Sequence, residues 1–197
     1  PSEDGIPVIP VADAVVNPKQ PDCNYPFPQL CGAGVAYKVL SYIFEQENNK
    51  SYIEELLPFA AIATVCDVVP LSDENRIIVS NGLKLLSDRS ILKNKGINAL
   101  LNELQLDRDI YAGDLGFRIG PCINAAGRLS DASKGMELLL SDNEEDAVIR
   151  ALELVNYNNE RKEMTARAEA EADRQVGSFD IQKEPVLVIY LENCHES

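Results

Sequence analysis

The order of apolar and polar positions predicts a chain made mainly of helices. Residues 1–30 are rich in Pro, Asn and Asp and indicate a loop around one short apolar strand, Asp13–Val16. Segment 115–128 mixes apolar residues with glycines, and its periodicity predicts neither helix nor strand. Apolar residues recur at helical spacing in five other segments: about 32–45, from Ser51 to the residues before Pro70, 74–87, 97–104 and 132–140.

The longest predicted helix runs from about Asn143 to Val176. Ser141 and Glu144 indicate a capping box at its start, just as Ser51 and Glu54 do for an earlier helix, and Gly177 stands where a helix C-cap belongs. In the first half, Val148, Leu152 and Val155 indicate an apolar stripe, whereas the second half is Ala with charged residues. Such a helix is either a solvated surface helix or a spacer between two domains.

A new strand, Val186–Tyr190, is predicted after this helix. A strand needs a partner, and nothing nearby in the sequence offers one. We therefore expect the rest of its sheet to lie outside this chain.

Composition excludes several classes of protein. The 197 residues are 45% hydrophobic and 25% charged, which is ordinary for a globular protein with one sizeable core. No apolar run approaches the roughly 20 residues of a membrane helix, and the first residues do not resemble a signal peptide. The five cysteines include no C-x-x-C pair, so they indicate neither a disulfide framework nor a zinc site and suit a reducing cytoplasm.

The net charge of −14 argues against nucleic-acid binding over the whole surface, because phosphates are held by Lys and Arg. By itself the charge favours an enzyme for a small ligand or a protein-binding module. A local cationic channel or a divalent metal ion could still neutralise phosphates on an acidic protein.

Asp67 is the first candidate for chemistry. It lies in the apolar run AAIATVCDVVPL and is the only charged residue between Glu55 and Asp73. An ionised carboxylate in apolar surroundings must be paired, hydrogen-bonded or bound to a metal. Two interpretations are open: an Asp that caps the next turn, or one ligand of a Mn²⁺ or Mg²⁺ site that needs several more.

A second candidate is the segment GFRIGPCINAAGRL, residues 116–129. Its run of small residues lets the backbone approach another surface closely, and Arg128 then offers a guanidinium suited to phosphate. The alternative is a tight helix-packing turn followed by a surface arginine. Asn124 and Arg118 share the segment, and Arg118 is expected to be a surface charge. His195, the single histidine, lies in YLENCHES, where a surface position is more common than a catalytic one.

Four segments together resemble the RecJ family of the DHH phosphoesterase superfamily. They are ADAVVNP (12–18), PQLCGAGVAYK (28–38), ATVCDVVPLSDENR (63–76) and GFRIGPCINAAGRLSDA (116–132). Their order and spacing match the family, and the pairing of the last two is specific within the superfamily.

The resemblance implies an α/β protein. Residues 1–141 would be the C-terminal, helix-rich part of a DHH catalytic domain and residues 142–177 the connector helix between domains. Residues 184–197 would be the start of a second domain, beginning with its first strand. The DHH triplet and the earlier Asp-rich motifs of the family are absent from the sequence. We therefore interpret the chain as a piece of a longer polypeptide.

The resemblance also implies roles for individual residues. Asp67 would be a catalytic, metal-binding aspartate, and Arg128 would hold the 5′ phosphate of the DNA. Asn124 and His195 would contact substrate as well, His195 from the second domain. Family members often carry Arg at the position of Cys122, so a second phosphate contact is not expected there.

The implied activity is a cytoplasmic 5′-to-3′ exonuclease for single-stranded DNA, used in repair and recombination. It would use two Mn²⁺ or Mg²⁺ ions, whose site is incomplete in this chain, so the chain alone is expected to be inactive. The implied partners are single-stranded DNA with a 5′ phosphate, single-strand-binding protein and a helicase, with no membrane. The alternatives are a nanoRNase or cyclic-dinucleotide phosphodiesterase of the same superfamily, and a non-catalytic binding homologue.

Overall fold

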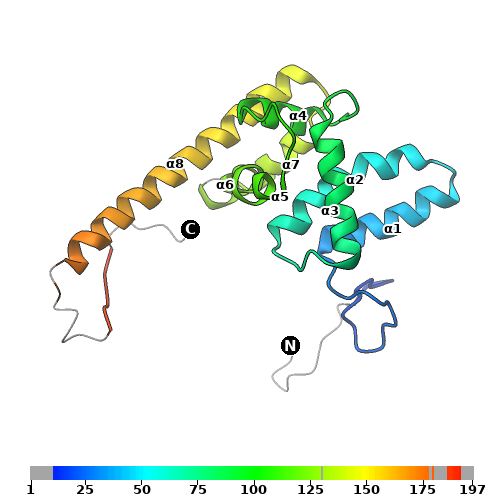
Figure 1. Ribbon diagram of the computed structural model, residues 1–197, viewed down its shortest axis with the longest axis horizontal. Coiled ribbons are helices and arrows are strands. Elements are labelled where there is room, and N and C mark those ends of the chain that lie inside the picture. Colours follow the sequence, from blue (N-terminus) through cyan, green and yellow to red (C-terminus); the bar gives the residue numbers. More distant parts are fainter. Residues whose placement is uncertain (1–10, 130, 178, 180–185, 192–197) are drawn as a thin grey trace. The chain divides into compact units, whose positions relative to one another are not determined.

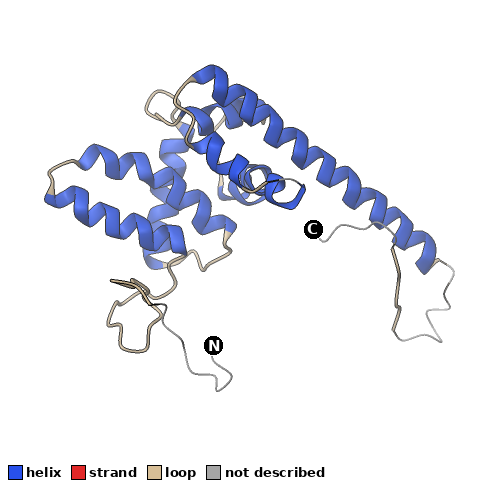
Figure 2. Cartoon of the chain, turned by 180° about the vertical axis from the view of Figure 1, so that it is seen from behind, coloured by secondary structure: helices blue, strands red, loops and turns tan. Residues whose placement is uncertain are grey.

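All regular elements of the described chain are helices. The computed structural model describes residues 11–129, 131–177, 179 and 186–191. Within them the strands expected at Asp13–Val16 and Val186–Tyr190 do not form (Figure 2). The second segment has Val188 at 83% exposure. A strand is stable only when it pairs, and the described residues supply no partner. The helix-rich prediction is therefore confirmed, whereas the α/β prediction is wrong for this part of the chain.

All six predicted helices are confirmed within a few residues, and the segment that periodicity left unassigned proves to be helical too. Residues 115–128 fold as a π-helical turn followed by an α-helix. A π-helix has more residues per turn than an α-helix, so it disrupts the apolar spacing on which the prediction rests. In chain order the elements are α1 (Gly32–Gln46), α2 (Lys50–Cys66), α3 (Asp73–Ser87), α4 (Lys95–Glu103), α5 (Ala112–Asp114), η1 (Leu115–Ile119), α6 (Gly120–Leu129), α7 (Ser133–Leu139) and α8 (Glu144–Val176).

Both predicted capping boxes are wrong, and asparagines stand at the N-caps instead. Asn143 caps α8, where its Oδ1 accepts a hydrogen bond from the backbone N–H of Asp146 at 2.7 Å. Ser141 instead donates to the carbonyl of Glu137, at the end of α7. Likewise α2 begins at Lys50, with Asn49 at its N-cap, although the Asn49 side chain makes no capping hydrogen bond. Because Asn caps a helix as well as Ser does, the spacing of Ser and Glu did not locate the start of α8.

Unit 1 is one of two compact units and consists of residues 1–91 and 109–112. A short turn joins α1 to α2, which lie side by side, and α3 packs against α2 (Figure 1). A glycine makes this last contact possible. A Cβ on Gly82 of α3 would lie only 2.3 Å from the Cβ of Ala61 on α2. One buried apolar cluster of the unit contains Phe27, Leu30, Ala60, Ala61 and Ile78.

Unit 2 consists of residues 92–108 and 113–197, and α8 is its scaffold. Helices α4, α6 and α7 all pack against α8, and its buried residues are Ala147, Ala151, Leu154 and Asn158. The predicted stripe is therefore wrong, since Val148 and Leu152 are 45% and 48% exposed. Two of the four buried residues of α8 are alanines, which let neighbouring helices approach closely.

The far half of α8 has no buried residue after Asn158, as the charged sequence predicts. The C-cap at Gly177 is confirmed: its N–H donates to the carbonyl of Asp173 at 3.0 Å. The role of 142–177 as a connector and the domain boundaries at 141 and 184 stay predictions. Within the described residues, no helix combines the length and the apolar character that crossing a membrane requires.

Candidate functional site

Asp67 lies at the C-cap of α2, in unit 1. Its backbone N–H donates to the carbonyl of Ala63 at 2.9 Å, and the residue is exposed. Among the described residues its carboxylate makes no ion pair or side-chain hydrogen bond. The expected apolar surroundings are therefore wrong, because only the part of the run before Asp67 lies in α2, and Val68 and Leu71 after it are exposed. The capping interpretation is wrong as well, since Ser72 is the N-cap of α3.

The backbone beside Asp67 is strained. Val68 has φ of 54°, in the left-handed region, and its side chain is 87% exposed. A β-branched residue rarely adopts this conformation, at a cost of about 1–3 kcal/mol. Asp73, at the other end of the α2–α3 turn, has φ of 43°. Such strain persists only where neighbouring contacts hold the backbone in place.

The electrostatics of this position suit a bound cation. The C-terminus of a helix carries partial negative charge, so an acidic residue there is unfavourable by about 0.3–1 kcal/mol. A divalent ion would offset both charges, and a carboxylate oxygen is the ligand type that Mg²⁺ and Mn²⁺ prefer. Asp67 therefore fits as one metal ligand. The described residues contain no group of three or more His, Cys, Asp or Glu side chains that could hold a metal.

The structure brings Arg128 and Asn124 together on one exposed side of α6, in unit 2. The two residues are four positions apart, which places them on the same helix face, and both are exposed. Arg128 makes no ion pair among the described residues, so its guanidinium is available to a ligand.

The small residues of the same segment serve packing. Ala125 and Ala126 are fully buried on the opposite side of α6, which contacts α7 and α8. A Cβ on Gly127 would lie 3.2 Å from the Cβ of Ala132, at the start of α7. The close approach is confirmed, but it is made to neighbouring helices of the same unit, as the helix-packing alternative predicts.

Phe117 is a residue that the sequence analysis missed. It lies on η1 with 83% of its surface exposed. It precedes α6, which carries Asn124 and Arg128, but the π-helical turn breaks the three-and-four spacing, so the sequence positions alone do not put Phe117 on their side of the helix. An aromatic ring exposed beside an arginine in this segment is the signal that could have identified it.

The one buried carboxylate of the described residues is Asp114, also missed. Arg108 makes two hydrogen bonds to its two oxygens, both 2.9 Å long. Arg118 lies 3.8 Å from the same carboxylate and donates to the carbonyl of Leu104, at the end of α4. Arg118 is therefore half-buried rather than a surface charge, and it fixes η1 against α4.

Cys122 is fully buried on α6 and is bound to α8. Asn158, 2% exposed, donates its side-chain N–H to Sγ of Cys122 at 3.3 Å, and Arg161 donates to Oδ1 of Asn158 at 3.1 Å. Burial raises the pKa of the Cys122 thiol, against smaller opposing effects of Lys162 and the Asn158 hydrogen bond. The thiol is neutral and enclosed, so it cannot contact a phosphate.

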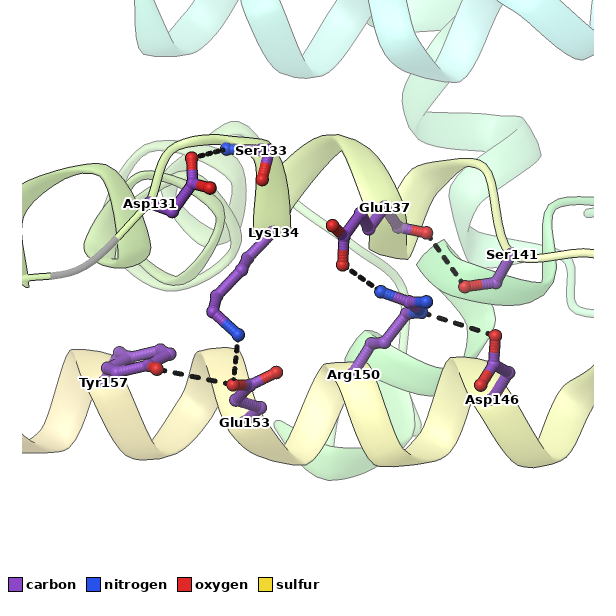
Figure 3. Close-up of polar contacts among 9 residues, drawn as sticks. All are labelled: Asp131, Ser133, Lys134, Glu137, Ser141, Asp146, Arg150, Glu153 and Tyr157. Atoms are coloured by element: carbon purple, nitrogen blue, oxygen red, sulfur yellow. Dashed lines mark hydrogen bonds and ion pairs between the residues drawn. The ribbon is translucent and has the colours of Figure 1, made fainter.

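A row of ion pairs fastens α7 to α8 (Figure 3). Nζ of Lys134 lies 2.5 Å from Oε1 of Glu153, and the hydroxyl of Tyr157 donates to the same oxygen at 3.3 Å. Arg150 of α8 pairs with Glu137 of α7. These ion pairs hold together α7 and α8, the two helices against which α6 packs.

His195, which the sequence analysis named as a substrate contact, lies outside the described residues.

No protein-family model matches the chain. Among curated proteins it is 40% identical to the single-stranded-DNA-specific exonuclease RecJ of Escherichia coli over 190 residues, which covers 85% of this chain and 33% of that protein. It is 34% identical to RecJ of Bacillus subtilis over 190 residues, or 92% of this chain and 22% of that protein. The chain thus spans a third or less of the length of these relatives.

The solved structures that resemble this chain are also RecJ proteins. The crystal structure of RecJ from Thermus thermophilus in complex with Mn²⁺ matches 81% of this chain with a TM-score of 0.65 and 30% identity, and the chain covers 23% of it. A structure of exonuclease RecJ bound to manganese matches 77% of this chain with a TM-score of 0.62 and 31% identity, and here the chain covers 37%.

Proposed function

Because the chain belongs to the RecJ family over the part of its relatives' length that it spans, we propose that it is a segment of a RecJ-type enzyme. That enzyme removes nucleotides from single-stranded DNA in the 5′-to-3′ direction, in repair and recombination, in the bacterial cytoplasm. The observation that carries the proposal is the pair of free, exposed charged groups in the two family motifs. Asp67 and Arg128 are both without a partner among the described residues.

Asp67 holds a divalent metal ion in this proposal. Its carboxylate is exposed at the negative end of α2, next to a strained backbone. When bound, Mn²⁺ or Mg²⁺ ions neutralise phosphate charge and lower the pKa of water. The remaining ligands come from the part of the enzyme that lies outside this chain, since one carboxylate cannot assemble a two-metal centre.

The exposed side of α6 binds the DNA end. Arg128 makes charge-assisted hydrogen bonds to the 5′ phosphate, which its planar guanidinium can do in pairs. Asn124 contributes a further polar contact one turn away. Phe117 offers a flat apolar surface on which a base can stack. His195 and the predicted second domain complete the substrate site.

The acidic net charge of −14 is compatible with this role because a 5′-end site needs few phosphate contacts. The acidic surface elsewhere limits non-specific binding along the strand.

The test is an exonuclease assay of the full-length enzyme that contains this chain, with Mn²⁺ or Mg²⁺ and 5′-phosphorylated single-stranded DNA. We expect mononucleotide release from the 5′ end and little activity on duplex DNA. Preferential cleavage of dinucleotides or cyclic dinucleotides would favour the nanoRNase or phosphodiesterase alternative. Metal-dependent DNA binding without cleavage would favour a non-catalytic homologue. The 197-residue chain by itself should release no nucleotides.

A further inference from the structure

Asn75, in the first turn of α3, is fully buried and joins two loops of unit 1. Its side-chain amide donates to the carbonyl of Pro70 at 2.9 Å and to the carbonyl of Gln29 at 3.0 Å. Pro70 lies in the turn that carries Asp67, and Gln29 lies in the loop that leads into α1. One side chain therefore holds both loops.

The orientation of this amide is fixed by its acceptors. Both partners are carbonyl oxygens, so a flipped amide would place oxygen against oxygen twice and lose both hydrogen bonds. The Oδ1 atom of Asn75 is left buried without a hydrogen-bond partner among the described residues. An unsatisfied buried oxygen lowers stability. The two hydrogen bonds that Nδ2 donates must offset this cost.

The turn held by Asn75 is strained. Residues 67–73 connect α2 to α3 (Figure 1), and Val68 and Asp73 have φ of 54° and 43°. Ser72, the N-cap of α3, makes no side-chain capping bond that would fix the turn from within. Because Val68 and Asp73 both have unfavourable positive φ angles, a contact from outside the turn must hold the backbone in this conformation. The bond from Asn75 to Pro70 is such a contact.

The neighbouring residue reinforces the same arrangement. Glu74 accepts a hydrogen bond from the hydroxyl of Tyr25 at 2.7 Å and lies 2.8 Å from Nζ of Lys38 on α1. The first turn of α3 is thus fastened to the loop before α1 and to α1 itself. Through its hydrogen bond to Pro70, Asn75 attaches the turn that carries Asp67 to this fixed first turn of α3.

We propose that Asn75 is a positioning residue for Asp67, holding the strained 67–73 turn in the conformation that presents the Asp67 carboxylate to a divalent cation. The inference rests on the proposed metal role of Asp67 and deepens it. Groups that orient a metal ligand without touching the metal commonly change metal affinity about 10- to 100-fold when they are removed. Asn75 acts on the backbone at Pro70, three residues from the ligand.

The experiment uses the full-length enzyme that contains this chain, freed of metal and titrated with Mn²⁺ by calorimetry. Asn75→Ala should raise the Mn²⁺ concentration for half-saturation about tenfold or more. At saturating Mn²⁺ the turnover number should return close to that of the parent, because the bound ion then orders the turn. Hydrogen exchange of the Asp67 and Val68 amides, which donate to the carbonyls of Ala63 and Val65, should become faster in the metal-free enzyme.

Asn81→Ala is the matched control. Asn81 lies on the same helix, is exposed, and accepts a hydrogen bond from Lys84 at 3.3 Å. It should change neither Mn²⁺ binding nor exchange in the turn. If Asn75→Ala does not fold, Asn75→Ser, which keeps one donor, is measured in the same way. The parent alone provides one further test. If the hydrogen-bonded amides of Asp67 and Val68 exchange as fast as those of an unfolded chain when no metal is present, the proposal is overturned.

Asp67→Ala separates this proposal from the one on which it rests. If Asp67→Ala abolishes a Mn²⁺ site while Asn75→Ala leaves Mn²⁺ binding unchanged, Asn75 has only a structural role and Asp67 remains a ligand. If Asp67→Ala leaves Mn²⁺ binding unchanged, both proposals fail.

Discussion

Asn158 of α8 donates a hydrogen bond to Sγ of Cys122 on α6, with 3.3 Å between the two atoms, and neither residue is more than 2% exposed. The bond lies in the packed interior of unit 2, on the side of α6 away from Arg128. It makes Cys122 part of the helix contact on which the proposed DNA-binding side depends.

Cys122→Arg should therefore destabilise the protein instead of adding a phosphate contact. The guanidinium would be buried near Arg118, Arg161 and Lys162 without a carboxylate partner, at a cost of about 3–5 kcal/mol in the free energy of unfolding. Denaturant unfolding measures this cost. Cys122→Ser is the control and should cost far less. A Cys122→Arg variant as stable as the parent, with tighter DNA binding, would contradict the buried arrangement.

Asp67→Ala should separate catalysis from folding. In the full-length enzyme we expect a large loss of turnover with DNA affinity nearly unchanged, because the residue holds metal and not substrate. In the isolated chain the same change should raise the free energy of unfolding by about 0.3–1 kcal/mol, since it removes a negative charge from the C-terminus of α2. Exonuclease assays, DNA titrations and denaturant unfolding give the three values. Near-normal turnover at saturating Mn²⁺ would disprove the metal role.

Arg128→Ala should weaken the preference of the full-length enzyme for a 5′-phosphorylated end by about 1–3 kcal/mol, the size of charged hydrogen bonds. Arg128→Lys should recover only part of this, because an ammonium cannot make the paired contact. The comparison is kcat/KM on 5′-phosphate and 5′-hydroxyl strands. Equal slowing on both substrates would indicate that Arg128 acts elsewhere than at the 5′ end.

Phe117→Ala should lower the affinity of the full-length enzyme for single-stranded DNA by about 1–3 kcal/mol, the usual value for a stacked base. Stability should hardly change, since the ring is 83% exposed. Ile149→Ala is the matched control, because Ile149 is an apolar residue of the same unit with 60% exposure. Equal DNA affinities for the two variants would remove Phe117 from the proposed site.

Glu74 should make unit 1 sensitive to acid. Burial raises the pKa of its carboxyl, but the hydrogen bonds from Lys38 and Tyr25 outweigh that effect and lower the pKa below its ordinary value. A carboxyl with a lowered pKa stabilises the fold above its unfolded pKa, and this stabilisation is lost as the pH falls through the folded pKa. The melting temperature of the parent, measured by thermal unfolding, should therefore fall in this acidic range. Glu74→Gln should be less stable at neutral pH and show a smaller pH dependence, and an unchanged slope would argue against the prediction.

The sequence by itself determined most of the helices, since apolar residues at a spacing of three or four predict a helix wherever that helix packs. Its motifs also indicated the RecJ family and directed attention to Asp67, Asn124 and Arg128. Local pattern failed at η1, where a π-helical turn breaks the α-helical period, and at the starts of α2 and α8, where asparagines and not the predicted serines stand at the N-caps.

Only the tertiary structure decided which side of each helix is buried and which polar groups have partners. Asp67 follows an apolar run in the sequence but lies beyond the end of α2, in solvent. Arg118 and Arg128 are alike in sequence, yet Arg118 is held by Asp114 and Leu104, while Arg128 makes no ion pair within the part of the chain that the structure describes. The reason is physical: a periodic pattern depends on residues a few positions apart, whereas burial and pairing depend on groups that folding brings together from distant parts of the chain. Asn75, with partners 5 and 46 residues away, is the clearest case.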